Sequence, residues 1–242
     1  NFDEAVIRWG RSFAALGISF KGGKLQLDLL DRKGKYDNGF CHYPMIVNFN
    51  DGKRNSGAAN FTCNVVYGQP GSGFRGMDTL FHEGGHAFNA IAARDETLLE
   101  YWSPPLEFAE VASMGMELLA LPHLDVFYPN PEDVRRIYRD QLEASIRLLS
   151  WIATIDAFQH WAYTNPNHTH EERREMWIKT FSRFQKGVDW AELDEELGYL
   201  WHRQLHLFLH PFYYIEYGIA QLGALQVWLN SKKDYRQAVE QY

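Results

Sequence analysis

The sequence predicts a mainly α-helical fold with a small antiparallel β-sheet. Apolar residues recur at helical spacing over most of the chain, whereas the alternation of apolar and polar residues that is typical of strands is confined to residues 24–67. Turn-forming clusters at residues 31–39 and 50–57 divide this region into three segments. The expected strands are residues 24–29, 45–49 and 60–67. No repeat or linker is visible, so we expect residues 1–242 to form a single domain.

The helices are predicted from periodicity and from residues that start or stop a helix. Residues 2–17 carry an apolar face, and Gly17 is a stop signal. Ser103 fits the N-cap of a helix over residues 103–117. Further helices are expected at residues 130–163, 169–185, 193–209 and 212–229, the last two being separated by Pro211.

The composition argues against two classes of partner. The chain has 242 residues and a net charge of −7, with no run of Lys and Arg, so we expect no nucleic-acid partner. No apolar run is long enough to span a membrane and no signal peptide is visible, so we expect no membrane association. Cys41 and Cys63 are too few for a disulfide framework, and we expect reduced thiols and a cytoplasmic location.

The most informative motif is His82-Glu83-Gly84-Gly85-His86, which has the pattern His-Glu-x-x-His. Residues four apart lie one above the other on a helix, so the imidazoles of His82 and His86 can converge on one metal ion. Glu83 projects at a different angle, where its carboxylate can accept a proton from a metal-activated water. The motif therefore predicts a catalytic zinc site, with Glu83 as the general base.

The expected third zinc ligand is Glu110. In a helix over residues 103–117, Glu110 shares a face with the apolar Leu106 and Met114, and burying a carboxylate on such a face is costly unless it binds a metal. Three protein ligands with one open position are typical of a catalytic zinc. Glu107, in the same helical turn, is the rival ligand.

Two separated motifs resemble a known family. They are Phe81-His82-Glu83-x-Gly85-His86-Ala87 and Phe108-x-Glu110-x-x-Ser113-x-x-x-Glu117, and they resemble the thimet oligopeptidase and oligoendopeptidase F family of zinc peptidases. Asp78-Thr79-Leu80 and residues 211–218 are most similar to the oligoendopeptidase F branch. The resemblance covers roughly residues 20–230. It departs from members that resemble thimet oligopeptidase at Asn89, where those members carry a further histidine.

The resemblance implies a zincin-type metallopeptidase catalytic domain that binds one zinc ion per chain and hydrolyses oligopeptides. Its partner would be a peptide substrate. Because members of the family are longer and this chain begins at Asn1, we expect it to be part of a longer protein, with a missing N-terminal segment as a further partner. A carboxylate that holds the second nitrogen of a ligand histidine is also expected. Glu117 is the candidate for that role and Asp78 its competitor.

The resemblance also implies that a histidine and tyrosines near the C-terminus donate hydrogen bonds to the oxyanion that forms during hydrolysis. Tyr214 and Tyr217 match a pair of tyrosines three residues apart in the family, and His206 lies near the matching histidine. We favour Tyr217, because Gly218 beside it leaves room for a substrate backbone. The choice among these residues stays open, with His210 and Tyr213 as the remaining candidates.

A sheet beside the zinc helix has two interpretations. In a peptidase, the strand at residues 60–67 could offer a free edge with which an extended peptide pairs. Alternatively, the sheet only covers the helices.

Two other functions also remain open. The chain could bind zinc and peptide without cleavage because the missing segment completes the site. The His-Glu-x-x-His pattern could also be coincidental in a helical interaction domain.

Overall fold

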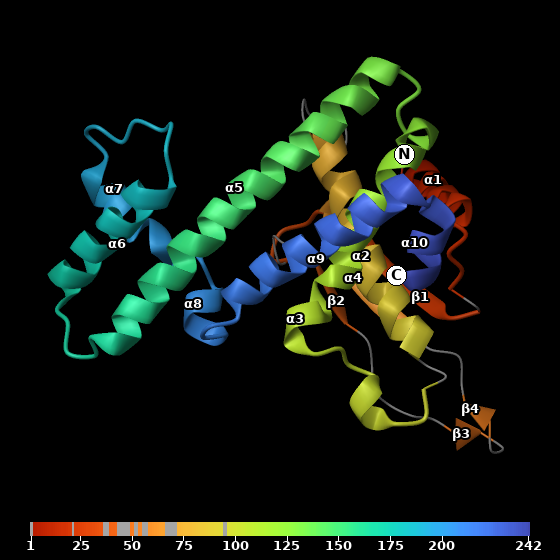
Figure 1. The fold of residues 1–242 in the computed structure, drawn as a ribbon, viewed down its shortest axis with the longest axis horizontal. Coiled ribbons are helices and arrows are strands. Elements are labelled where there is room, and N and C mark those ends of the chain that lie inside the picture. The colour runs from red at the N-terminus through yellow and green to blue at the C-terminus, as the bar shows by residue number, and fades with distance from the viewer. Residues whose placement is uncertain are drawn as a thin grey trace. The chain divides into compact units, whose positions relative to one another are not determined.

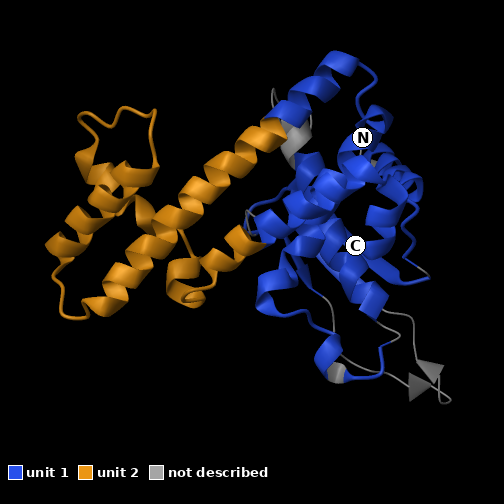
Figure 2. Ribbon diagram, viewed as in Figure 1, with its two compact units in different colours: residues 1–139, 220–242 blue, residues 140–219 orange. Residues whose placement is uncertain are grey.

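The structure is a computed structural model. It describes residues 2–20, 22–35, 39–42, 49–50, 53–54, 58–65, 72–93 and 96–242. The chain divides into two compact units, of which unit 1 comprises residues 1–139 and 220–242, and unit 2 comprises residues 140–219 (Figure 2). Two helices, α5 (Pro131–Thr164) and α9 (Tyr214–Lys233), contribute residues to both units. The expectation of a single domain therefore stays a prediction.

The remaining elements, labelled in Figure 1, each belong to one of the units coloured in Figure 2. Unit 1 contains α1 (Phe2–Ala15), β1 (Lys24–Leu30), β2 (Phe40–His42), β3 (Phe49–Asn50), β4 (Lys53–Arg54), β5 (Ala58–Val65), α2 (Ser72–Ala92), the 3₁₀ helix η2 (Leu99–Tyr101), α3 (Leu106–Ala109), α4 (Val111–Ala120), η3 (Leu121–Val126) and α10 (Tyr235–Gln241). Unit 2 contains α6 (His170–Phe184), α7 (Asp194–Tyr199), η4 (Leu200–Arg203) and α8 (His206–Leu209). Among the helices of the described ranges, none is both long enough and apolar enough to cross a membrane.

The N-terminal amphipathic helix is confirmed as α1. Its Trp9 and Phe13 are buried, and Trp9 Nε1 donates a hydrogen bond to the carbonyl of Leu80 at 3.0 Å, so α1 packs on α2. Gly17 has a φ of +75°, a conformation that favours glycine and ends the helix as expected.

The sheet is mixed, with the strand order β1-β5-β2. β1 pairs with β5 in parallel, whereas β2 pairs with β5 in antiparallel orientation. The expectation of an antiparallel sheet is therefore wrong for the first pair and confirmed for the second. Alternation predicts which side chains share a face, but it carries no information on strand direction, and the long connection between β1 and β5 permits a parallel return.

Two of the three expected strands are present, since residues 24–29 correspond to β1 and residues 60–67 to β5. Most of the expected strand at residues 45–49 lies outside the described residues, and Phe49 opens the short strand β3. Because β5 is paired on both sides, the expectation that residues 60–67 form a free edge is wrong. Within the described part of the sheet, β1 and β2 are the edges.

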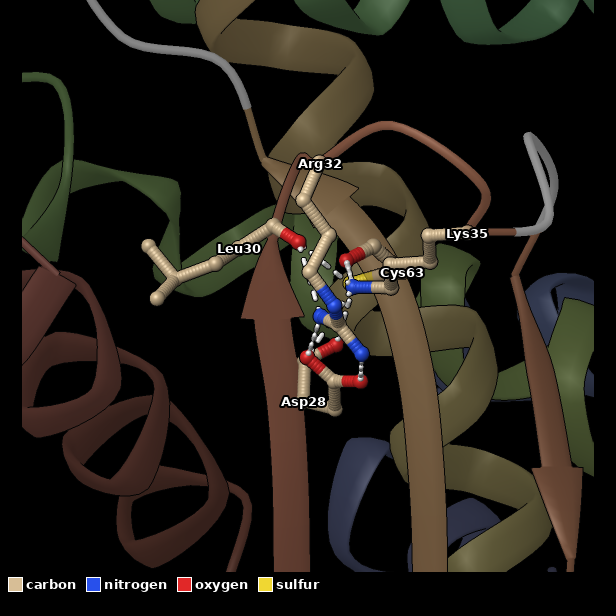
Figure 3. Close-up of polar contacts among 5 residues, drawn as sticks. All are labelled: Asp28, Leu30, Arg32, Lys35 and Cys63. Carbon is tan, nitrogen blue, oxygen red and sulfur yellow. Dashed lines mark hydrogen bonds and ion pairs between the residues drawn. The ribbon is translucent and has the colours of Figure 1, made fainter.

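A buried lysine joins the two parallel strands where their register shifts, between Asp28 and Leu30. The side chain of Lys35 is only 5% exposed. Its Nζ donates to the carbonyls of Asp28 at 2.8 Å, Leu30 at 3.0 Å and Cys63 at 2.9 Å (Figure 3). These bonds tie the two strands together at the point where the ladder is irregular. Arg32 binds the Asp28 carboxylate through two nitrogens at 2.7 Å each and lowers the pKa of Asp28 to about 2.

The helix expected at residues 103–117 is interrupted. Pro105, not Ser103, precedes the short helix α3, and Glu110 separates α3 from α4. The backbone of Glu110 has φ −94° and ψ −5°, which departs from regular helical geometry. The expectation of one continuous helix from Ser103 is therefore wrong, because a capping signal and apolar periodicity do not reveal a one-residue break.

Of the helices expected between residues 130 and 209, the structure confirms two and corrects the third. α5 and α6 lie where periodicity predicts them, and α6 begins with a capping box between Thr169 and Glu172. The single helix expected at residues 193–209 is wrong, because that range is divided into α7, η4 and α8. The backbone leaves the helical region at Gln204, whose ψ is 91°. A second break precedes α9, where Phe212 has a φ of +60°.

Candidate metal centre

Three potential metal ligands converge in unit 1. His82 and His86 lie one turn apart on α2, and Glu110 reaches them from the junction of α3 and α4. Glu110 Oε2 lies 3.2 Å from His82 Nε2 and 3.3 Å from His86 Nε2. The three donor atoms all lie within 4.8 Å of one another. The structure thus brings together the three residues that the sequence predicts as ligands.

The helical break determines how Glu110 is presented. Glu110 is only 6% exposed, and Ser113 Oγ donates to its Oε2 at 2.8 Å. Glu107 is exposed, and it is not part of the three-residue cluster. The argument from a shared helical face is only partly correct, because Met114 is buried while Leu106 is 58% exposed. The break turns the segment containing Leu106 away from the face on which Glu110 lies.

A glycine allows α2 and α4 to approach closely enough for this geometry. A Cβ atom at Gly85 would lie 2.3 Å from the carbonyl oxygen of Ala112 and 2.8 Å from the Cα of Ser113. Both are backbone atoms, so any side chain at residue 85 would force the helices apart. The sequence contains Gly85 within the motif, but periodicity does not reveal that α4 packs against it.

A second carboxylate orients His82. Glu117 Oε1 lies 2.6 Å from His82 Nδ1, so the expectation that Glu117 holds the second nitrogen is confirmed. A neutral imidazole that donates its Nδ1 proton carries a lone pair on Nε2, and Nε2 is the His82 atom that faces Glu110. For Asp78, the competing candidate, burial and then the charge of Glu117 raise the pKa well above its usual value.

The charge distribution requires a cation among these donors. A lone pair on His82 Nε2 would be repelled by the Glu110 carboxylate unless a proton or a metal ion lay between them. In the absence of metal, burial opposes protonation of His82, but hydrogen bonds with Glu110 and Glu117 raise its pKa well above the usual value. Burial likewise opposes the charged form of Glu110, yet the two histidines hold the pKa of Glu110 far below its usual range. Two imidazoles and one carboxylate are a donor set that zinc accepts.

The donor distances fit zinc as well. Tetrahedral coordination with bonds of about 2.0–2.1 Å places ligand atoms about 3.3 Å apart. The distances of 3.2 and 3.3 Å from Glu110 to the two histidines agree with this value. The residues present therefore fit a zinc ion with three protein ligands and an open position.

Glu83 lies next to His82 on α2 and is 4% exposed. Its buried Oε2 has no hydrogen-bond partner among the described residues. Burial raises the pKa of Glu83, and the nearby histidines oppose this shift only in part. A buried carboxylate without a donor retains a strong tendency to accept a proton.

The expected oxyanion donors lie in unit 2, where a chain of hydrogen bonds connects them. Trp151 Nε1 donates to Gln204 Oε1 at 3.0 Å, and Gln204 Nε2 lies 2.7 Å from His206 Nδ1. His206 Nε2 lies 3.1 Å from the hydroxyl of Tyr217. Tyr214 is 9% exposed in the core of unit 2, where burial raises its pKa to about 12.

The direction of this chain follows from its first donor. An indole nitrogen can only donate, so the Gln204 atom it meets is the oxygen, and the amide nitrogen donates to His206 Nδ1. His206 then carries its proton on Nε2 and donates to Tyr217, which must direct its own proton to a different acceptor. Neither Trp151 nor Gln204 was identified from the sequence, since nothing local distinguishes them from structural residues.

The other two candidates contact the same histidine through their rings. The centroids of Tyr213 and His210 lie 6.0 Å and 6.3 Å from that of His206. Whether any of these residues donates to an oxyanion stays a prediction.

Comparison with known proteins identifies the family. Residues 19–242 match the model of peptidase family M3. PZ peptidase A with inhibitor 2 is similar in structure, with a TM-score of 0.75 and 33% identity over 88% of this chain and 35% of that chain. A structure named putative oligoendopeptidase F has a TM-score of 0.73 and 31% identity, over 96% of this chain and 38% of that chain. No match was found among curated proteins.

This chain thus spans little more than a third of either solved structure. The resemblance to the oligoendopeptidase F branch is confirmed by the matched family and by the second structure. The family match covers far more than the motifs alone, since it extends through both units. The chain therefore belongs to peptidase family M3.

Proposed function

We propose that this chain is a zinc-dependent metalloendopeptidase that hydrolyses peptide bonds of oligopeptides. The observation that carries the proposal is the convergence of His82 Nε2, His86 Nε2 and Glu110 Oε2 beside the buried carboxylate of Glu83. Membership of a peptidase family supports the same conclusion. The free thiols of Cys41 and Cys63 fit the cytoplasmic location expected from the sequence, which remains part of this proposal.

Each residue of the centre has a role in this proposal. His82, His86 and Glu110 hold the zinc ion, and Glu117 keeps the His82 proton on Nδ1 so that Nε2 can bind metal. A bound zinc ion supplies a Lewis acid that polarises water and the peptide carbonyl. Glu83 accepts the proton of the attacking water and passes it to the amine of the leaving peptide.

The substrate peptide would pair with β2 instead of β5. β2 is an edge of the described sheet, and the residue before it, Gly39, lies against Glu83. Tyr217 is proposed to donate its hydroxyl proton to the oxyanion, because the bond from His206 occupies the oxygen and not the proton.

The first prediction tests the base. Glu83→Gln keeps the size of the side chain but cannot accept a proton, so peptide turnover should fall by roughly 10²–10⁴-fold. Zinc content and thermal unfolding should remain those of the wild type. Cleavage of an internally quenched peptide, with zinc measured in the same samples, is the experiment. Near-normal kcat in the zinc-loaded variant would contradict the proposed mechanism.

A second candidate function is zinc and peptide binding without cleavage. It is favoured by one observation, that this chain covers only 35–38% of the solved relatives. The same assay distinguishes the two functions, because a binding protein would retain zinc and bind the peptide while wild type and Glu83→Gln both fail to cleave it.

A further inference from the structure

The general base proposed above, Glu83, is a buried carboxylate on α2. Glu83 is 4% exposed, and its Oε2 has no partner among the residues that the structure describes. A flexible glutamate in this situation must be held by packing, or it would lose the position from which it reaches the substrate water.

The packing that restrains Glu83 on one side comes from the residue just before β2. A Cβ atom at Gly39 would lie 2.5 Å from Glu83 Oε1 and 3.2 Å from Glu83 Cδ, as well as 2.9 Å from Thr79 Cγ2. Thr79 and Glu83 are four residues apart on α2 and therefore share a face. The backbone at Gly39 thus lies directly against that face.

Space, not backbone conformation, is the reason for glycine at this position. Gly39 is not among the glycines with a positive φ, so its conformation is open to other residues. A real Cβ atom essentially never approaches another atom within 3.0 Å, so any side chain at residue 39 would displace the Glu83 carboxylate or Thr79. The carboxylate would have to move by about 0.5–0.9 Å to restore an ordinary contact.

We propose that Gly39 is a positioning residue that holds Glu83 by contact alone. The inference rests on the proposed function, in which Glu83 is the general base. A donor from the protein would also fix the carboxylate, but it would stabilise the charged form and weaken the base. Contact with a backbone that carries no side chain restrains Glu83 and leaves both oxygens able to accept a proton.

The two thiols of the sheet agree with this placement. Burial raises the pKa of Cys41, on β2, and of Cys63, on β5, to about 12 each. In both cases burial is the largest cause of the raised pKa, and the charge of Glu83 is the second. The carboxylate therefore lies close to the sheet surface that begins at Gly39.

The test is Gly39→Ala in the zinc-loaded protein. A displacement of up to about 1 Å should lower kcat roughly a hundredfold, while KM and zinc content stay close to those of the wild type. A crystal structure of the variant should show the Glu83 carboxylate displaced, with His82, His86 and Glu110 in place. Unchanged kcat together with an unmoved carboxylate would overturn the inference.

Combining Gly39→Ala with a second substitution shows whether contact with Glu83 or with Thr79 causes the loss of kcat. Glu83→Asp shortens the side chain by one methylene and withdraws the carboxylate from residue 39, so adding Gly39→Ala to Glu83→Asp should change kcat by less than about twofold. Thr79→Ser removes the Cγ2 methyl, the other close contact, and should not restore the kcat of Gly39→Ala. A full hundredfold loss in the Glu83→Asp background, or rescue by Thr79→Ser, would overturn the inference.

A control variant, Gly23→Ala, distinguishes a loss of stability from a loss of positioning of Glu83. A Cβ at Gly23 would lie 2.6 Å from Ile91 Cγ2 and 2.9 Å from the carbonyl oxygen of Phe20, and Glu83 is not among its three nearest atoms. Gly23→Ala should therefore lower Tm and preserve kcat. If Gly39→Ala does not fold, the double variant with Glu83→Asp should fold, and its failure would count against the inference.

A failure of the proposed function can be distinguished from a failure of the inference about Gly39. If the zinc-loaded wild type cleaves no peptide, the proposed function fails. The contact between Gly39 and Glu83 is then still judged by the crystal structure of Gly39→Ala, which requires no turnover.

Discussion

At the scale of single residues, the centre is built from groups that are costly to bury alone. The Glu110 carboxylate is 6% exposed and has two imidazoles and a hydroxyl as neighbours. The burial of such a carboxylate is tolerated because its charge is compensated. The protein should therefore depend on Glu110 for metal binding far more than on its exposed neighbour Glu107.

The second prediction compares these two carboxylates. Glu110→Ala removes a ligand that lies 3.2–3.3 Å from both histidines, so the variant should lose zinc and peptidase activity together. Glu107→Ala changes an exposed side chain outside the cluster and should retain both. Metal content after exhaustive dialysis is the measurement. Equal zinc retention in the two variants, or loss only in Glu107→Ala, would refute the ligand assignment.

At the scale of secondary-structure elements, the centre depends on how closely α2 and α4 approach. The two histidines belong to α2. Glu110 directly precedes α4, and Glu117 lies within α4. Close packing at Gly85 keeps the two sets of proposed ligands near each other. A change that separates the helices should therefore affect metal affinity as well as stability.

The third prediction is that Gly85→Ala weakens zinc binding. A Cβ at that position would lie 2.3 Å from a backbone oxygen of α4, so the helices must move apart and carry Glu110 away from the histidines. Overpacking of this kind costs about 1–3 kcal/mol of the free energy of unfolding. Gly10→Ala on α1 is the control, since a Cβ there has nothing within 4 Å. Zinc affinity equal to wild type in Gly85→Ala, measured with a chromogenic chelator, would be inconsistent with this role.

The fourth prediction concerns the ion cluster that joins β1 to β5. Hydrogen bonding to Arg32 lowers the pKa of Asp28 to about 2 in the folded chain. Its contribution to stability should therefore be complete above the unfolded pKa of about 3.9 and be lost as the pH falls toward 2. The difference in Tm between wild type and Asp28→Asn should be present at pH 7 and vanish near pH 2. A difference in Tm that stayed the same from pH 7 to pH 2 would contradict this role of Asp28.

At the scale of the whole molecule, the residues with proposed roles are distributed over both units. The metal ligands and Glu83 belong to unit 1, whereas Tyr214, Tyr217 and His206 belong to unit 2. The family match extends over residues 19–242 and so includes both. A catalytic role for unit 2 can therefore be tested by single hydroxyl deletions.

The fifth prediction separates a catalytic tyrosine from a structural one. Tyr217→Phe removes the hydroxyl that His206 contacts, and kcat should fall roughly ten- to a thousandfold with little change in KM or Tm. Tyr214 is a buried core residue, so Tyr214→Phe should lower Tm and preserve kcat. Both variants should be measured for kinetics and thermal unfolding side by side. If Tyr217→Phe leaves turnover unchanged, the C-terminal segment has a structural role.

Much of the helical framework could be predicted from the sequence. The apolar face of α1, the long helix α5 and the capped start of α6 are local patterns, and the structure confirms them. The breaks at Glu110 and Gln204 could not be predicted, because local patterns do not show the distant residues that these side chains contact, which are His82 and His86 for Glu110 and Trp151 for Gln204. α10 was also missed, although Asp234 caps its start.

For the centre, the pairing of the two histidines and the proposed base can be predicted from the motif alone, because a spacing of four residues on one helix places two imidazoles together in any fold that keeps that helix. The sequence also identified Glu110 and Glu117 as candidates. Three features become visible only in the folded chain: Glu110, not Glu107, reaches the histidines, β5 is the central strand, and Gly39 lies against Glu83. The physical reason is that these contacts join segments far apart in the chain. Local periodicity describes the face of one element, but not which other element covers it.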